Sequence, residues 1–262
     1  MAASVRPVRA AIRVLRVLAS LNARTEAGAA ELARDLRMSR ATTYRLLETL
    51  VDSGFAEKDP TTAHYTPTET VKSLSCGFDD EQWIRKCALP VLSDLGSTLL
   101  WPIAIATLAG PTLLVRASTD IRSPLAVRRF PPGRRIGLVS TASGLVYLAY
   151  CGVDQRETLL DILGQSDDPE NTAARERASL RRRLTSIRER GYAQFNRKGS
   201  VANQAGLAVP VLAHNRILAS LSIRFAVTTV SAETIRHRFL PDLRAGAAAI
   251  GAEFESVSQA TL

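Results

Sequence analysis

The first part of the chain alternates apolar and polar positions with the three-to-four-residue period of amphipathic helices. This pattern predicts a helix within residues 1–24, a second helix over 29–36 and a third from 40 to about 52. Ser39 is a good N-cap for the third helix, and Gly54 follows that helix as a residue that commonly ends helices. Two short strands, within residues 55–66, would flank a turn rich in breakers. Residues 1–67 are therefore expected to form three helices followed by a hairpin.

The remainder of the chain mixes strand and helix patterns. Residues 68–78 predict a linker, and a helix is expected from Asp79, with a kink or restart at Pro90 because proline has no amide hydrogen. The further expected elements are strands over 102–108 and 112–117, helices over 141–150, 154–163 and 175–190, a hairpin of 206–212 with 217–225, and a helix over 232–255. These patterns predict an α+β fold, in which residues 79–262 form one domain behind a smaller helical domain.

Composition narrows the class of protein. The chain has 262 residues, 46% of them hydrophobic, and a formal net charge of +9. These values exclude a disordered or collagen-like protein and make nucleic acid the first partner to test. The three cysteines form no Cys-x-x-Cys pair, which suits a reducing cytoplasm. Since no apolar run reaches the roughly 18 residues that a membrane-spanning helix needs, no membrane partner is expected.

Arginine concentrates in two places, residues 1–24 and residues 175–198. In the first, Arg9, Arg13 and Arg16 follow helical spacing and would interrupt the apolar core of a secretory signal peptide. A transit peptide stays open as a minority alternative. The second stretch is interpreted as a solvated helix face, which is the common fate of a charge run.

The second and third predicted helices have the spacing of a helix-turn-helix. Ala33 is small enough for the two helices to cross closely, and Leu36, Leu46 and Leu50 would fill the wedge between them. The first residues of the third helix would then reach into the major groove of duplex DNA. Arg37 stands at the turn position where glycine is usual, and a left-handed conformation there would cost on the order of 1 kcal/mol.

The DNA-contacting side chains are expected at the start of the third helix and on the hairpin, which would act as a wing. Arg45 is the first choice for a base contact because arginine is the commonest reader of guanine, whereas the hydroxyls of Ser39 and Thr42 suit phosphate. The expected DNA contacts are Ser39, Arg40, Thr42, Thr43, Tyr44, Arg45, Lys58 and His64. A three-helix bundle that shows this spacing by chance is the alternative.

These segments make the sequence similar to a known family, the IclR-type bacterial transcription regulators, over nearly its whole length. The resemblance lies in LRMSRATTYRLLETL (36–50), in STASGLVYLA (140–149) and in the late hairpin, 207–222. It implies an N-terminal winged helix-turn-helix domain, a linker helix, and a C-terminal effector-binding domain with a GAF-like antiparallel sheet. It also implies dimers or dimers of dimers, with the first helix and the linker at the interface.

Within that family, GFDDEQWI (77–84) and TASGL (141–145) resemble MhpR-type regulators of hydroxyphenylpropionate catabolism. This resemblance implies an effector-dependent activator of an aromatic-acid catabolic operon. The implied partners are a double-stranded DNA operator, a small aromatic carboxylic acid, a second copy of the chain and RNA polymerase. A repressor that responds to a non-aromatic small carboxylic acid is the alternative.

The resemblance places the effector pocket between the sheet and the start of the helix at 141–150. A helix N-terminus can hold a carboxylate through its free amides, and three hydroxyls lie there, with ordinary N-capping as their alternative role. Ser220 and Ser222 alternate on one strand face and match pocket serines of relatives, while Gly206 stands where some relatives have a ligand-contacting cysteine. The expected pocket residues are Ser140, Thr141, Ala142, Ser143, Gly206, Ser220, Ser222, Trp101, Phe130 and Leu145.

The sequence leaves alternatives for two features of this pocket, its apolar wall and its counter-ion. Core packing is the alternative role for its three large apolar members. A counter-ion for the carboxylate could come from an arginine before the helix, and the sequence does not select among Arg128, Arg129, Arg134 and Arg135.

Enzyme signatures do not emerge from the sequence. His64, His214 and His237 show no metal-ligand spacing, and Ser143 lacks the first glycine of a nucleophile elbow. Catalytic residues, a metal and a cofactor are therefore not expected. The rival classes are an enzyme built on the α+β domain and a peripheral membrane protein anchored by residues 1–24.

Overall fold

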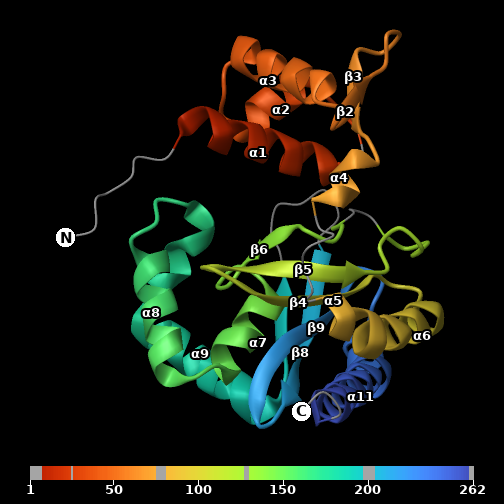
Figure 1. Cartoon of the computed structure of the whole chain (residues 1–262). Helices are drawn as coiled ribbons and strands as arrows, with labels where there is room; N and C mark the ends of the chain where they lie inside the picture. Colours follow the sequence, from red (N-terminus) through yellow and green to blue (C-terminus); the bar gives the residue numbers. More distant parts are fainter. Residues whose placement is uncertain (1–7, 25, 75–80, 127–129, 197–203, 260–262) are drawn as a thin grey trace. The chain divides into compact units, whose positions relative to one another are not determined.

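The computed structural model describes residues 8–24, 26–74, 81–126, 130–196 and 204–259 (Figure 1). Contacts within the chain divide it into two compact units, residues 1–79 and 80–262. Each unit has buried apolar clusters of its own. The expected helix start at Asp79 and part of the expected linker lie outside the described residues.

Unit 1, residues 1–79, contains helices and a small three-stranded sheet. Its elements are α1 (Arg9–Asn22), β1 (Ala27–Gly28), α2 (Ala29–Leu36), α3 (Arg40–Asp52), β2 (Ala56–Lys58), β3 (His64–Pro67) and the short α4 (Thr70–Ser73). Strand β3 lies between β1 and β2 and pairs antiparallel with both. The expected order of three helices and a hairpin is confirmed, and β1 is an added strand that is too short to leave a sequence pattern.

The core of unit 1 joins all three helices to the hairpin. Leu21 of α1, Leu32 of α2, Leu47 of α3 and Tyr65 of β3 are buried in one cluster. The third helix ends as the sequence predicts, because Gly54 adopts a φ of 74° just beyond it. Helix α3 is therefore packed against α1, α2 and the hairpin.

Unit 2, residues 80–262, is built on a six-stranded antiparallel sheet with the strand order β6–β5–β4–β9–β8–β7. Its strands are β4 (Ile103–Ala109), β5 (Thr112–Ser118), β6 (Arg135–Gly137), β7 (Ala193–Asn196), β8 (Gln204–Ala213) and β9 (Arg216–Ala226). Its helices are α5 (Glu81–Trp83), α6 (Leu89–Leu99), α7 (Ala142–Tyr150), α8 (Val153–Gly164), α9 (Arg177–Arg190), α10 (Ala232–Thr234) and α11 (Leu240–Gln259). The α+β fold is confirmed, whereas the short edge strands β6 and β7 were not predicted.

Helices cover both faces of this sheet (Figure 1). Helices α6 and α11 pack on one face, and α7, α8 and α9 belong to the cluster on the other. Successive strand residues point to opposite faces, so Leu221 and Ile223 of β9 lie in the cluster with α6 and α11. Ser220 and Ser222 consequently point toward α7.

The restart expected at Pro90 takes the form of a wide helical turn. A π-helical turn, Ile84–Ala88, precedes α6, and Pro90 lies in the first turn of that helix. A second π-helical turn, Ile235–Phe239, precedes α11, which begins Leu240–Pro241. A wider turn accommodates the missing amide and the bulk of the proline ring without ending the helical path.

Helix α7 lies very close to the chain segment that precedes it. A Cβ atom added to Gly144 would overlap the carbonyl oxygens of Gly137 and Leu138. From the sheet, Ser220 Oγ donates a hydrogen bond to the Ser143 carbonyl at 2.9 Å, between two buried residues. Backbone contact on one side and a buried hydrogen bond on the other fix the start of α7.

We predict that Gly144→Ala destabilises the fold by about 1–3 kcal/mol or more, because backbone atoms must move to admit the methyl group. Urea denaturation measures the loss. Gly206→Ala is the matched control, since its Cβ would meet only the Ala142 Cβ, at 3.6 Å, which is an ordinary contact. Equal unfolding free energies for the two variants would contradict the prediction.

Candidate functional site

The first turn of α3 is set by a side-chain cap. Ser39 Oγ accepts a hydrogen bond from the Thr42 amide at 3.1 Å and donates to Thr42 Oγ1 at 2.8 Å. In the turn before it, Arg37 has a left-handed φ of 53°, and the Met38 amide donates to the Ala33 carbonyl at 2.9 Å. Arginine therefore adopts the conformation that glycine usually supplies in this turn, and the turn between α2 and α3 keeps its tight form.

One residue of the expected DNA-contacting set faces the core instead. Thr43 is fully buried, and its hydroxyl donates to the Ser39 carbonyl at 3.1 Å. The expectation of a DNA contact from Thr43 is therefore corrected: its position on α3 falls on the inner face, one turn from Leu47. Arg40, Tyr44 and Arg45 are exposed, and Ser39 with Thr42 lies at the accessible helix start.

The hairpin is tied to α3 by a charged cluster that the sequence analysis did not anticipate. Glu48 accepts hydrogen bonds from Tyr65 Oη at 2.6 Å and from Lys58 Nζ at 3.0 Å. These bonds hold the pKa of Glu48 below its usual value, and the bond to Glu48 raises the pKa of Lys58. Lys58 Nζ also lies 4.9 Å from the centre of the Tyr44 ring. Lys58 would thus have to exchange Glu48 for a phosphate in order to contact DNA.

His64, the other hairpin residue of the expected set, is half-buried on β3. It is the register partner of Gly28 on β1. His64 is the first residue of β3, beside the hairpin turn.

In unit 2 a cavity of about 90 Å³ lies at the start of α7. It is lined by Ala104, Val115, Phe130, Ile136, Ser140, Thr141, Ala142, Ser143, Phe195, Gln204, Ala205, Gly206, Ser222 and Arg224. Seven of the ten residues expected in the pocket are among them: Phe130, Ser140, Thr141, Ala142, Ser143, Gly206 and Ser222. The cavity is small, and most of its wall is apolar.

The other three expected residues do not line this cavity. Trp101 packs against the cluster on the α6 and α11 face, and Leu145 is fully buried in the cluster beneath α7. Ser220 is fully buried, with its hydroxyl engaged by the Ser143 carbonyl. The expected pocket positions of Trp101, Leu145 and Ser220 are therefore corrected, because each side chain is used in packing or in holding α7.

Two hydroxyls at the start of α7 have partners within the protein. Thr141 Oγ1 accepts from the Gly144 amide at 3.0 Å and donates to the Gly137 carbonyl at 2.7 Å. Ser140 Oγ donates to Glu170 at 3.0 Å. Thr141 thus acts as the N-cap of α7. Ser222 Oγ, on the cavity wall, donates to the Ala104 carbonyl at 3.3 Å, a longer bond.

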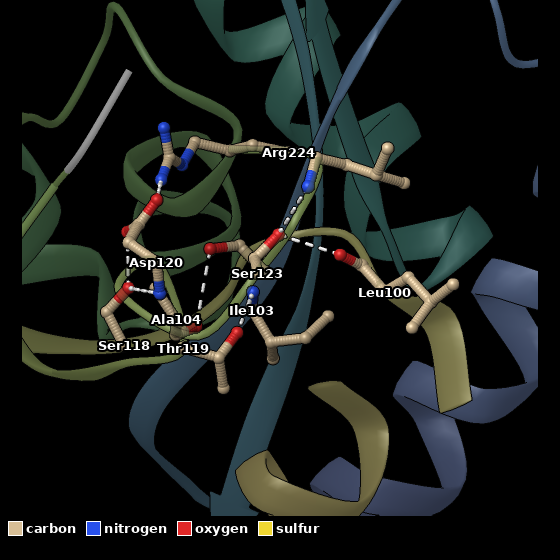
Figure 2. A network of polar contacts seen from close by, with 10 residues as sticks. Leu100, Ile103, Ala104, Ser118, Thr119, Asp120, Ser123 and Arg224 are labelled. Atoms are coloured by element: carbon tan, nitrogen blue, oxygen red, sulfur yellow. Dashed lines mark hydrogen bonds and ion pairs between the residues drawn. The ribbon is translucent and has the colours of Figure 1, made fainter. Parts of the chain in front are cut away.

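Sequence reasoning missed the charged residues at the edge of this cavity. Arg224 of β9 lines the cavity and forms an ion pair with Asp120, which follows β5 (Figure 2). Continuing the alternation of Ser220 and Ser222 by one step along β9 would have found Arg224. Among the expected counter-ions, Arg135 instead donates to Ala109 O and Thr112, and Arg134 contacts the Phe130 ring. Arg128 and Arg129 lie outside the described residues.

A larger open cleft, of about 1150 Å³, lies at the opposite end of α7. Arg156 and Arg188 in its wall donate to the carbonyls of Leu148 and Ala149, at 3.4 and 3.1 Å. Basic side chains are favourable at the C-terminal end of a helix. Nearby, Arg181 of α9 pairs with Glu157 of α8 at 2.9 Å, so these arginines of the cleft stabilise the helices around them.

Within the described parts of the chain, no group of three or more His, Cys, Asp or Glu side chains is arranged to hold a metal ion. No helix of these parts is long and apolar enough to cross a membrane.

Comparison with known proteins gives relatives over most of the chain. In curated sequences, the transcriptional regulator KdgR of Escherichia coli K12 is 26% identical over 232 residues, which cover 87% of this chain and 86% of KdgR. A transcriptional regulator of Rhodococcus sp. RHA1 has a similar structure, with a TM-score of 0.66 and 20% identity, over 96% of this chain and all of that one. An IclR homolog of Microbacterium hydrocarbonoxydans, solved with 4-hydroxybenzoate, has a TM-score of 0.65 and 21% identity, over 94% of this chain and 99% of that one.

Two family models account for both units. The IclR helix-turn-helix domain matches residues 10–60, and the C-terminal domain of the bacterial transcriptional regulator IclR matches residues 80–252. The matched family and relatives are transcription regulators and not enzymes. On these matches, and with a winged helix-turn-helix followed by an antiparallel sheet domain, the chain belongs to the IclR family of DNA-binding transcription regulators.

Proposed function

We propose that this chain is an effector-responsive activator of an operon for the catabolism of aromatic acids. In this proposal unit 1 binds a duplex operator, and the cavity at the start of α7 binds a small aromatic carboxylic acid. The observation that carries the proposal is that cavity, which places Phe130 and Phe195 beside the first turn of a helix of nine residues. An apolar wall suits an aromatic ring, and a helix N-terminus suits a carboxylate.

The proposed DNA-binding surface is the exposed face of the first two turns of α3, together with the hairpin. Arg40, Tyr44 and Arg45 are exposed on that face, and arginine can bind a guanine edge with two hydrogen bonds. Ser39 and Thr42 are proposed to contact phosphate. Lys58 and His64 are proposed to contact the DNA backbone from the hairpin, with Lys58 released from Glu48.

Operator affinity should fall steeply as salt rises, because phosphate contacts release counterions from DNA. Fluorescence anisotropy with labelled operator fragments, titrated at several potassium chloride concentrations, measures the slope. An affinity that stays flat between low and moderate salt would contradict DNA binding by this surface.

Arg45→Ala should weaken operator binding by about 1–3 kcal/mol, because an exposed arginine at the start of a recognition helix contacts a base or phosphate. Binding is measured by the same anisotropy titration. The control is the melting temperature, which should not change since Arg45 is exposed. A loss of stability as large as the loss of binding would make Arg45 structural.

The size of the cavity favours a small effector. A volume of about 90 Å³ is well below the roughly 300–1,000 Å³ of pockets for drug-sized ligands. The same observation favours the second candidate function, a repressor of the same family that responds to a small non-aromatic carboxylic acid. Titration with benzoate, 4-hydroxybenzoate and pyruvate separates the two ligand classes, and transcription from the operator separates activation from repression.

If the start of α7 holds a carboxylate, the acid should bind much more tightly than its methyl ester, since charge-assisted hydrogen bonds are roughly twice as strong as neutral ones. Ser222→Ala should weaken binding of the acid by about 0.5–3 kcal/mol and leave DNA binding without effector nearly unchanged. Calorimetry with 4-hydroxybenzoate and its methyl ester measures both effects.

Ser220→Ala is the matched control for Ser222→Ala. Because the Ser220 hydroxyl is buried against the Ser143 carbonyl, its loss should lower the unfolding free energy by about 1–3 kcal/mol. Equal binding of acid and ester by the wild type would place the carboxylate site elsewhere.

Three further parts of the proposal concern assembly and location. We propose that the chain forms homo-oligomers through α1, where Ile12 and Leu15, together with Val8 just before the helix, are exposed at helical spacing. An exposed apolar row on a helix is typical of an interaction surface. As an activator it would contact RNA polymerase, and as a DNA-binding regulator it would act in the cytoplasm.

A further inference from the structure

Arg224 is the only charged residue that lines the cavity at the start of α7, among the residues that the structure describes. It belongs to the face of β9 that carries Ser220 and Ser222, because residues two apart on a strand point the same way. The alternate residues Leu221, Ile223 and Phe225 lie in the cluster on the opposite face of the sheet. Arg224 therefore brings the one formal charge of the described wall to a site that is otherwise uncharged.

The guanidinium of Arg224 is held by a buried carboxylate. Its Nη2 forms an ion pair with Asp120 Oδ1, and the side chain of Asp120 is 1% exposed. Ser118 Oγ also donates to Asp120, and the Asp120 amide donates to Ser118 Oγ at 3.2 Å (Figure 2). Removing one partner of a buried ion pair leaves an uncompensated charge, which is strongly unfavourable. The pair therefore persists and fixes the direction of the guanidinium.

Two further contacts shape the surroundings of Arg224. Its guanidinium carbon lies 4.0 Å from the centre of the Phe130 ring, a distance at which the ring attracts the cation. Across the strand pair, the register partner of Arg224 is Gly206, which has no side chain. Both Phe130 and Gly206 line the cavity, so Arg224 is flanked by an aromatic ring and by a position that has no side chain.

We propose that Arg224 binds the carboxylate of the effector and that Asp120 is a positioning residue for it. The proposal rests on the proposed function, since it assigns the charge recognition in the same cavity. Arginine presents five N–H donors in a planar fork that matches a carboxylate, so Arg224 can serve Asp120 and a ligand together. The first turn of α7 adds partial positive charge. A small carboxylate whose apolar group lies against Phe130 is the ligand class that this arrangement selects.

The experiment compares binding of 4-hydroxybenzoate and 4-hydroxybenzamide to the full chain by calorimetry, with benzoate and pyruvate as further acids. Arg224→Gln should weaken acid binding at least tenfold and leave amide binding within about threefold, so the preference for acid largely disappears. Arg224→Lys, which keeps the charge and loses the fork, should retain part of that preference. Arg135→Gln removes an arginine outside the cavity wall and should leave both affinities unchanged.

The positioning role of Asp120 has a separate readout. Asp120→Asn should lower the affinity for the acid several-fold while the affinity for the amide stays nearly constant, whereas a merely structural role would lower both together. Thermal unfolding identifies variants that do not fold. For those, the folded Arg224→Lys variant keeps the inference testable.

Three results would overturn the inference: equal losses of acid and amide binding in Arg224→Gln, no loss in that variant, or failure of the wild type to bind any of the acids. Operator binding is measured in parallel on the wild type. If the acids fail to bind but salt-dependent operator binding persists, the proposed role of Arg224 is rejected. The proposal that the chain is a DNA-binding regulator is then retained. If operator binding is absent, the proposed function fails instead. Binding of pyruvate alone, lost in Arg224→Gln, would support Arg224 and replace the aromatic class of ligand.

Discussion

The close packing of α7 on β9 is the constraint on which the effector domain depends. At Gly144 the helix leaves no room for a side chain beside the preceding backbone, and Ser220 Oγ is bonded to the Ser143 carbonyl from the sheet. Protein interiors packed this tightly transmit displacement because they cannot absorb it. The first turn of α7 is thereby set beside Ser222, Gly206 and the rest of the cavity wall.

Strand β9 has an apolar face and a polar face. One face carries Leu221, Ile223 and Phe225 into a continuous apolar cluster, and the other carries polar side chains toward α7. Buried polar groups are tolerated only where they have hydrogen-bonding partners. The Ser143 carbonyl satisfies Ser220, and Asp120 pairs with Arg224. The polar face can therefore extend from a closed contact at Ser220 to the cavity at Ser222 and Arg224.

The DNA-binding unit uses a similar division between the two faces of α3. Thr43 and Leu47 are buried, while Arg40, Tyr44 and Arg45 are exposed on the same helix. The pairing of Glu48 with Lys58 and Tyr65 fastens the hairpin to this helix. The exposed side chains of α3 and the hairpin are consequently held in a fixed arrangement, which is what precise contact with a duplex would require.

The sequence alone determined the order of the main helices and strands, because their hydrophobic periods are local signals. The N-cap of α3 at Ser39 and the end of α3 before Gly54 are local signals as well. The sequence also determined the family through three motif segments and named half of the residues that line the cavity at the start of α7. Only the tertiary structure decided that Thr43, Ser220, Trp101 and Leu145 turn inward, since helical or strand spacing does not say which face is covered. It also decided the pairing of Asp120 with Arg224, which lie 104 residues apart. Such a pair leaves no local pattern, because only the assembled sheet brings β5 and β9 to the same cavity.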